Sequence, residues 1–320
     1  MSRTDRRARS SDAVKPSFLW TAPTWPQGVP RQGPERRIGL EYDHDWSRRY
    51  PVRLMRAVLV DNVTKPLTRV MAPATVRGLD RLRHLEGPVI FAANHASHID
   101  TALLLTTLPT RFRHKTAVAA ASDTFFDRTW KAALWSLSLA AIPIDRTRVN
   151  RRSSDTAAGL LRDGWNLIIF PEGGRTADGW AQPFRGGAAY LSERTGVPVI
   201  PVYLHGTRRV FPKRDDDPMP PSGIENDRRR LRRSPVAVLF GDPLTARAGE
   251  DARRFGIRVE QAITLLGDEV ATDWWQARRR AAGDDPPTLR GPAASSWRRA
   301  WALGPSPADD LPVAHGRWPR

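Results

Sequence analysis

The stretch GPVIFAANHASHIDTALLLTTL, residues 87–108, decides the fold. Its apolar run PVIFAA, at 88–93, predicts a buried β-strand. The segment from Asp100 through TALLLTTL predicts a helix with Asp100 as its N-cap. A strand that leads directly into a helix is the repeating unit of α/β proteins. This stretch therefore predicts a sheet covered by helices.

The same alternation continues outward as far as Asp242. Short apolar runs predict strands, and the segments between them predict helices. The predicted strands are KTAVAA (115–120), IPI (142–144), NLIIF (166–170), VPVIPVYL (197–204) and VAVLF (236–240). Helices are predicted over 124–140 and 186–195. Another is capped by Ser154 and Asp155 and ends at Gly164. One or two more lie within 250–280, with Phe255, Val259, Ile263 and Leu266 facing inward. The predicted fold class is α/β, with a single mixed, largely buried sheet flanked by helices. Pro201 lies in mid-run, which favours an edge strand or a bulge.

An amphipathic helical segment precedes the predicted sheet. Its apolar residues recur at three- and four-residue spacing, and the predicted helix is interrupted at Pro66 and resumes afterwards. These residues are Leu54, Met55, Val58, Leu59, Val63, Leu67, Val70 and Met71. Two interpretations stay open: a helix packed on the core, or a basic helix that lies in a lipid interface.

The expected organisation has four parts. Residues 1–45 form a disordered or loosely attached segment, 46–75 the amphipathic and possibly membrane-associated helices, 76–275 the main domain, and 276–320 a flexible tail. Within the main domain, residues 211–235 are expected to form an exposed loop that carries the basic run Arg228–Arg233. The tryptophans of the tail, Trp297, Trp301 and Trp318, lie beside arginines and are candidates for contact with lipid headgroups.

Composition excludes several classes of protein. The 320 residues contain no cysteine, which excludes disulfide frameworks, cysteine nucleophiles and thiolate metal sites. The formal net charge of +17 predicts attraction to anionic lipid, phosphate ligands or nucleic acid. No apolar run reaches the roughly 20 residues of a transmembrane helix, and we expect no signal peptide, because no apolar run follows the basic N-terminal residues. We expect a cytoplasmic protein, free or peripherally attached to the cytoplasmic face of a membrane.

The sharpest local pattern follows the first strand. His95 and Asp100 are five residues apart, so they meet only if the chain between them turns before the helix begins. In that arrangement Asp100 fixes the imidazole tautomer and leaves Nε2 free to take a proton. The alternative is an N-cap aspartate beside an ordinary loop histidine. A metal site formed by His95, His98 and Asp100 is a further alternative, which would make the protein a metal-dependent hydrolase.

A second polar cluster, Phe170–Thr176, follows the strand NLIIF. Its glycines allow backbone N–H groups to approach an anion, and Arg175 can bind a phosphate through two parallel hydrogen bonds. Glu172 can orient Arg175 or accept a hydrogen bond from a ligand hydroxyl. A plain glycine turn with a surface ion pair is the alternative. Arg146, after the strand IPI, and Arg185 add positive charge near this cluster.

In this order, these residues resemble the glycerolipid acyltransferases, most closely the 1-acylglycerol-3-phosphate acyltransferases. The resemblance covers roughly residues 50–270. The family's first block, N-H-x4-D, is matched by Asn94, His95 and Asp100; the second ends in Asp145-Arg146; the third, F-P-E-G-T-R-S, is Phe170–Thr176; and the fourth is Val199–Val202. Ala141 and Pro143 replace the usual glycine and aromatic residue of block two, and Gly174 and Thr176 replace threonine and serine of block three.

The resemblance implies an O-acyltransferase of phospholipid biosynthesis. His95 would be the general base, oriented by Asp100, and would activate the acceptor hydroxyl against the thioester of acyl-CoA or acyl carrier protein. The acceptor's phosphate would be held by Glu172, Gly173, Gly174 and Arg175, with help from Arg146 and Arg185. No metal and no cofactor is implied, because the acyl donor is a co-substrate.

Partners follow from the same resemblance. They are the acyl donor, a lysophospholipid acceptor and an anionic membrane surface. Acceptors other than 1-acylglycerol-3-phosphate, such as glycerol-3-phosphate or a glycolipid, remain open. Nucleic acid is not expected, because the dense basic run lacks the interleaved aromatic residues that stack on bases.

Overall fold

The structure, a computed structural model, describes residues 42–126, 128–144, 151–176, 180–211, 233–283 and 286–290. Within these residues the chain forms one mixed sheet of seven strands, in the order β1-β7-β6-β2-β5-β3-β4. The strands are β1 (Ala74–Arg77), β2 (Ile90–Ala93), β3 (Thr116–Ala121), β4 (Ala141–Ile144), β5 (Asn166–Ile169), β6 (Val199–His205) and β7 (Val236–Phe240). The predicted α/β class with a single mixed sheet is confirmed.

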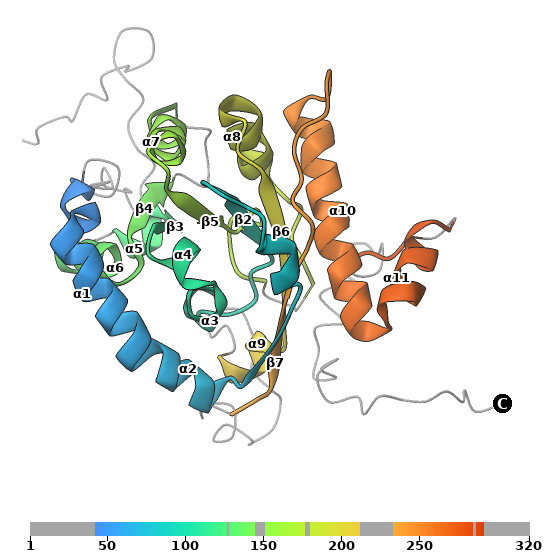
Figure 1. Ribbon diagram of the computed structural model, residues 1–320, viewed down its shortest axis with the longest axis horizontal. Coiled ribbons are helices and arrows are strands. Elements are labelled where there is room, and N and C mark those ends of the chain that lie inside the picture. The colour runs from blue at the N-terminus through green and yellow to red at the C-terminus, as the bar shows by residue number, and fades with distance from the viewer. Residues whose placement is uncertain are drawn as a thin grey trace, which may run out of the picture. The chain divides into compact units, whose positions relative to one another are not determined.

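Helices cover both faces of the sheet (Figure 1). The described helices are α1 (Tyr50–Leu59), α2 (Lys65–Met71), α3 (Ile99–Thr107), α4 (Thr110–Arg113), α5 (Ser122–Phe125), α6 (Thr129–Leu139), α7 (Arg151–Arg162), α8 (Gly187–Thr195), α9 (Thr207–Val210), α10 (Ala252–Ala271) and α11 (Trp274–Ala281). Two 3-10 turns, η2 (Asp45–Arg48) and η4 (Leu79–Leu82), and a π turn, η3 (Val60–Thr64), complete them.

The core has two main layers because successive side chains of a strand point to opposite faces. In β2, Phe91 and Ala93 pack with residues of α3, whereas Ile90 and Ala92 pack with residues of α7, α8 and α10. All four side chains are fully buried. A strand buried on both faces has a continuous apolar sequence, which is the pattern of PVIFAA.

The central strands run parallel. β2 pairs with β5 on one side and with β6 on the other, and both pairs are parallel. The carboxyl ends of β5, β2 and β6 therefore meet at one edge of the sheet. Beyond β6 the direction reverses, because β7 pairs antiparallel with β6, and β1 lies parallel to β7 at the outside.

The prediction that Pro201 marks an edge strand was wrong. β6 is an interior strand, with β2 and β7 on its two sides. The ladder with β7 pairs Val202 with Phe240, and after that residue the chain leaves β7. Gly241 donates a backbone hydrogen bond to the carbonyl of Pro201 at 2.8 Å. Pro201 thus lies beside Gly241, just beyond the end of β7, and pairing continues through its carbonyl and through Val199 and Leu244 despite its missing N–H.

The N-terminal helix also differs from prediction, because it is not interrupted at Pro66. α1, η3 and α2 run on without a break, and Figure 1 shows them as one long rod. In η3 the Lys65 N–H bonds to the carbonyl of Val60, five residues back. This π turn inserts one extra residue just before Pro66, where the α-helical hydrogen-bond pattern would otherwise be lost.

The apolar stripe of this helix faces outward. Six of its eight predicted residues, Leu54, Met55, Val58, Val63, Leu67 and Val70, are more than half exposed, as is Tyr50. Leu59 and Met71 are partly buried, and Met71 packs against the core. Apart from Met55, the exposed residues are spaced four apart along α1, five across the π turn and three or four along α2, so the π turn keeps the stripe on one side. The inward side carries Arg56, Val60 and Thr68, which are buried. The structure therefore does not bear out the interpretation that this stripe packs on the core.

Several boundaries also differ. β1 was not predicted, because ATVR is too short and polar to stand out. α7 is already helical at Arg151, so Ser154 and Asp155 lie inside it and do not cap it. The predicted helix over 124–140 is divided into α5 and α6, and 250–280 holds two helices, with the four predicted inward residues of α10 buried. Most of 1–45, most of the loop 211–235 and the tail from 291 lie outside the described residues.

Within the described ranges, no helix is both long enough and apolar enough to cross a membrane.

Candidate active site

The predicted site residues come together at the carboxyl edge of the central strands. His95 lies just after β2, and residues 170–176 follow β5, the neighbour of β2. Arg185 precedes α8, and its N–H donates to the carbonyl of Pro171 at 2.8 Å. Parallel strands bring their carboxyl ends to one edge, which is where open α/β sheets bind ligands.

His95 and Asp100 form a hydrogen-bonded pair. The Nδ1 atom of His95 lies 2.9 Å from Oδ2 of Asp100. The chain between them turns, and α3 begins at Ile99, so Asp100 lies in the first turn of the helix and is not its N-cap. The same oxygen of Asp100 accepts the N–H groups of Ala96 and Ser97, at 2.8 and 2.7 Å. The carboxylate is completely buried, and these two backbone N–H groups hold its Oδ2 beside the imidazole.

The His95 ring is held in place from a second side. It stacks on Phe170, with ring centroids 4.1 Å apart and an angle of 22° between the planes. Its side chain is only 16% exposed. With Nδ1 on Asp100, the imidazole has Nε2 left for a ligand or a proton. The ring is therefore fixed in position and in tautomer, which is what a general base requires.

Glu172 connects the two motifs. Its Oε1 accepts the backbone N–H of His95 at 2.7 Å, and its Oε2 accepts the N–H of Gln182 at 2.8 Å. The side chain is buried, with 3% exposed. The N–H of Thr176 in turn donates to the carbonyl of His95 at 2.9 Å. A carboxylate engaged in this way positions the loop that carries His95 and the loop after β5 relative to each other.

The glycine turn of the second motif is shaped around Arg185. Gly173 has a φ of +71°, in the left-handed region that favours glycine. A Cβ atom at this position would lie 2.8 Å from Nε of Arg185. The guanidinium of Arg185 therefore lies directly against the turn, and Arg175 belongs to the same loop. A glycine turn with an arginine against it, and a second arginine in the same loop, is a combination suited to a phosphate group.

Two predicted features remain, Arg146 and the alternative metal site. Arg146, with its neighbour Asp145, lies outside the described residues. Among the residues that the structure does describe, no three histidine or carboxylate side chains are grouped so that they could hold a metal ion. The His95–His98–Asp100 arrangement does not form such a group, since Nδ1 of His95 is engaged by Asp100.

Three supporting interactions were not predicted from the sequence. Asn94 belongs to the first motif, and its side chain makes two hydrogen bonds to the backbone of Leu204 on β6, at 2.7 and 3.0 Å, which extend the sheet beyond β2. Ser97 donates its hydroxyl to the carbonyl of Phe211, which ties the loop that carries His95 to the segment after β6. Burial and the negative charge of Glu172 raise the pKa of Tyr203, so this phenol stays neutral. The motif contains Asn94 and Ser97, but their partners lie more than 100 residues away.

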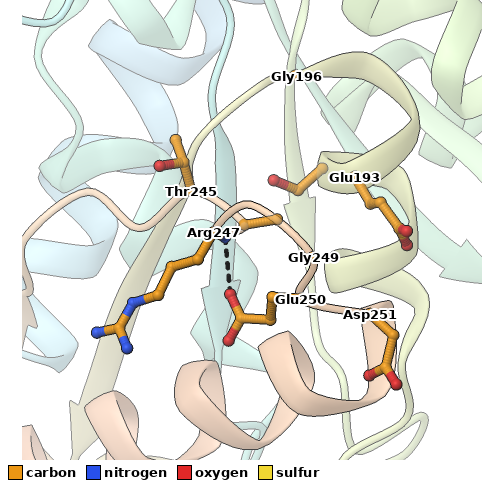
Figure 2. A pocket seen from close by; sticks show the side chains of 9 residues that line it. Glu193, Gly196, Thr245, Arg247, Gly249, Glu250 and Asp251 are labelled. Atoms are coloured by element: carbon orange, nitrogen blue, oxygen red, sulfur yellow. Dashed lines mark hydrogen bonds between the residues drawn. The ribbon is translucent and has the colours of Figure 1, made fainter.

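A separate pocket of about 600 Å³ lies at the opposite, amino-terminal edge of β6. Figure 2 shows Glu193 and Gly196 of the α8 end facing the loop with Arg247, Glu250 and Asp251. The backbone N–H of Arg247 bonds to Glu250 at 2.9 Å, and this bond, with the charges of Arg258 and Arg247, lowers the pKa of Glu250. None of the predicted site residues lines this pocket.

Comparison with known proteins gives a consistent result. Residues 73–205 match the family model described as Acyltransferase. The chain is 29% identical over 145 residues to the chloroplastic 1-acyl-sn-glycerol-3-phosphate acyltransferase BAT2 of Brassica napus, which is 43% of this chain and 38% of that protein. It is 25% identical over 191 residues to the alpha 1-acyl-sn-glycerol-3-phosphate acyltransferase of Bos taurus, 58% of this chain and 60% of that protein. The chain thus spans less than two thirds of these curated relatives.

A solved structure has a similar fold. It is the 1-acyl-sn-glycerophosphate (LPA) acyltransferase PlsC from Thermotoga maritima, with a TM-score of 0.50 and 21% sequence identity. The similarity covers 72% of this chain and 84% of that protein. At this level of identity the likeness concerns the arrangement of the sheet and its helices.

Proposed function

We propose that the protein transfers a fatty acyl group to 1-acylglycerol-3-phosphate, because residues 73–205 match the Acyltransferase family model and parts of the chain are similar to 1-acyl-sn-glycerol-3-phosphate acyltransferases. The product is phosphatidic acid, a precursor of phospholipids. The donor is a thioester, acyl-CoA or acyl carrier protein. The observation that carries this proposal is the buried His95–Asp100 pair, hydrogen-bonded at 2.9 Å beside the basic turn after β5.

His95 acts as the general base of this reaction. Its Nε2 takes the proton of the acceptor hydroxyl while that oxygen attacks the thioester carbonyl. The new C–O ester bond forms, the C–S bond breaks, and the proton passes from the imidazolium to the departing thiolate. Asp100 stabilises the imidazolium and keeps Nε2 directed at the substrate. No covalent acyl-enzyme is needed.

The acceptor's phosphate binds at the turn after β5. The N–H of Gly173 already bonds to the carbonyl of Phe170 at 3.0 Å, so the turn itself is held in shape. Gly174 lets the backbone approach the phosphate, and Arg175 and Arg185 supply the charge. The support for this assignment is the contact of the Arg185 guanidinium with the Gly173 turn. We include Arg146 in the same phosphate site from the sequence pattern alone. Glu172 holds the turn in place, since both of its oxygens accept backbone N–H groups and a carboxylate repels phosphate.

We also propose that the long N-terminal helix attaches the enzyme to the cytoplasmic face of a membrane. Its exposed apolar stripe is the part of the surface best suited to enter the lipid interface. α6 contacts α1 and adds the exposed Trp130 and Leu134. Exposed apolar side chains gathered on neighbouring helices mark a site of association with a membrane or a protein. At a membrane the enzyme meets an acceptor and a product that are both dissolved in the bilayer.

Two variants and a control test the catalytic assignment. Purified protein is supplied with lysophosphatidic acid and oleoyl-CoA, and the release of free CoA is measured. His95→Ala is expected to lose about 10²- to 10⁴-fold in rate, the usual contribution of a general base. Asp100→Asn is expected to fall comparably, because the imidazole loses its fixed tautomer. Retained activity in His95→Ala would disprove the mechanism.

His98→Ala is the matched control, because His98 lies in the same loop and is exposed. General-base catalysis by His95 predicts nearly normal rates for this variant and full activity in EDTA. A metal site built on His95, His98 and Asp100 predicts loss in both cases.

A panel of acceptors (lysophosphatidic acid, glycerol-3-phosphate and a glycolipid) with acyl-CoA or acyl carrier protein as donor identifies the substrates.

A further inference from the structure

α11 lies beyond the acyltransferase domain and has an unusual outer surface. The helix is capped by Asp273, whose Oδ1 accepts the N–H of Gln276 at 2.8 Å. It packs on α10 through the fully buried Ala277. The two tryptophans at its start are exposed, Trp274 to 46% and Trp275 to 63%. Exposed tryptophans are costly in water unless they serve an interaction.

The exposed tryptophans are arranged together with arginines. In a helix that turns 100° per residue, Trp274, Trp275, Arg278 and Arg279 lie within an arc of about 140°. The two indole rings stack with centroids 6.2 Å apart. The guanidinium of Arg278 lies 4.4 Å from the centre of the Trp274 ring. These four residues, which we call the α11 patch, form one continuous aromatic and cationic surface.

The charge of the α11 patch is not neutralised within the helix. The sequence of α11, WWQARRRA, contains no acidic residue. Arg280 is different, since it pairs with the buried carboxylate of Asp268 at 2.6 Å and faces away from the patch. A ring stacked beneath Arg278 orients the guanidinium but leaves its positive charge. The patch therefore presents indole rings and at least one arginine fork to a common partner.

We propose that the α11 patch binds the phosphate headgroups of anionic phospholipids, as a second membrane contact separate from α1 and α2. Indole rings favour the boundary between headgroups and acyl chains, and arginine binds phosphate through two parallel hydrogen bonds. The inference extends the proposed membrane location of the enzyme. It adds charge selectivity, which the apolar stripe of α1 and α2 does not provide.

The position of α11 suits this role. α1 and α2 belong to the layer that contains α3, whereas α11 packs on α10 in the opposite layer. In Figure 1, α2 and α11 lie on the left and right of α9, which follows the carboxyl end of β6. The two contacts thus flank the edge of the sheet that carries His95. A bilayer that reaches both would face the proposed active site.

Vesicle co-sedimentation of the full chain tests the proposal. The probes are vesicles of phosphatidylcholine alone and vesicles in which about a third of the lipid is phosphatidylglycerol. The wild-type protein is expected to prefer the anionic vesicles. Arg278→Gln combined with Arg279→Gln is expected to weaken anionic binding by about 30-fold, since each basic residue near such a surface contributes about 1 kcal/mol. Binding to neutral vesicles should stay unchanged.

The matched control is Arg253→Gln combined with Arg254→Gln, two exposed arginines of α10. It removes the same charge and is expected to retain most of the anionic binding. Trp274→Ala combined with Trp275→Ala removes the aromatic part and should weaken anionic binding without changing the charge. Thermal unfolding of each variant shows that exposed substitutions leave the fold intact.

Equal losses in the α11 and α10 arginine pairs would overturn the proposal, because the effect would then be general attraction. Unchanged binding by the α11 variants would also overturn it. Poly-glutamate is the second probe: if the patch variants lose only poly-glutamate binding, the surface serves an acidic protein, and the lipid assignment is wrong. Failure of acyl transfer, measured with detergent-dissolved acceptor, would count against the proposed function and leave the vesicle result standing.

Discussion

At the scale of single residues, the site depends on buried acceptors that each bind several donors. One oxygen of Asp100 accepts hydrogen bonds from His95, Ala96 and Ser97, and the carboxylate is fully buried. Glu172 does the same for two separate loops. Such carboxylates cannot be exchanged for amides, because an amide places a donor opposite a backbone N–H. Their contribution is geometric and does not require contact with the substrate.

Glu172→Gln tests this positioning role. The exchange costs about 1–3 kcal/mol if one backbone N–H loses its acceptor, which corresponds to about 10- to 100-fold in kcat when the loss falls on the transition state. KM for lysophosphatidic acid should stay the same or fall, since a negative charge near the phosphate is removed. Steady-state kinetics separate the two constants.

Glu193→Gln, on the exposed side of α8, is the matched control and should behave like wild type. The opposite pattern, a raised KM with a normal kcat, would mean that Glu172 binds the acceptor directly, as the family resemblance first suggested.

At the scale of elements, the N-terminal helix is oriented by one buried arginine. Arg56 donates from Nε to the carbonyl of Leu137 at 2.7 Å and from Nη2 to those of Ser47 and Ser136, at 2.5 and 3.1 Å. Two of these carbonyls belong to the last turn of α6, where a cation is favourable. Burial, with repulsion from Arg53 and Arg48, lowers the pKa of Arg56 to about 10, far above neutral pH. Arg56 thus remains charged while it holds α1 with its apolar stripe outward.

Arg56→Met is expected to destabilise the fold. Three backbone carbonyls lose their donor, and the end of α6 loses its cap, at a cost of about 2–4 kcal/mol. Arg69→Met, the same exchange at an exposed position of α2, should change stability by less than about 0.5 kcal/mol. Urea unfolding measures both. Equal stability of the two variants would show that Arg56 does not anchor α1.

The outward stripe can be tested separately from the fold. Leu54→Gln combined with Val58→Gln should weaken binding to neutral phosphatidylcholine vesicles by about 30-fold, because each half-exposed side chain has about 1 kcal/mol of apolar burial to gain in lipid. Stability should be unchanged. Ile257→Gln, an equally exposed apolar residue on α10, is the control. Full vesicle binding by the α1 double variant would remove the case for this membrane contact.

The features that could be predicted from the sequence are those set by residues close to one another along the chain. The six predicted strands are encoded within a few neighbouring residues, whereas the spacing of His95 and Asp100 left open whether the two side chains meet. The orientation of the α1 stripe was not predictable, because periodicity shows which side chains share a face but not where that face points. Arg56 decides it, through partners 80 and 81 residues away. Pro201 was assigned to an edge strand for a similar reason. A proline is accepted at this position of β6 because β7, far along the sequence, ends at Phe240.

At the scale of the whole molecule, one side of the sheet is completed by strands from distant parts of the sequence. β7, near the C-terminal helices, lies between β6 and β1, so the first strand of the sheet is held only through the last. The acyltransferase match stops at residue 205, where β6 ends, and does not include β7. The unit defined by sequence similarity is therefore smaller than the unit that can form a complete sheet.

This arrangement sets a lower limit on any fragment made for crystallography or assay. A fragment of residues 73–205 would keep every described motif residue, but β6 would lose its partner strand β7, and β1 would have no strand to pair with. Exposed strand edges pair with other copies of the chain, so the fragment should elute as an aggregate in size-exclusion chromatography. A fragment extended through residue 283 restores β7 and α10 and should elute as a discrete species.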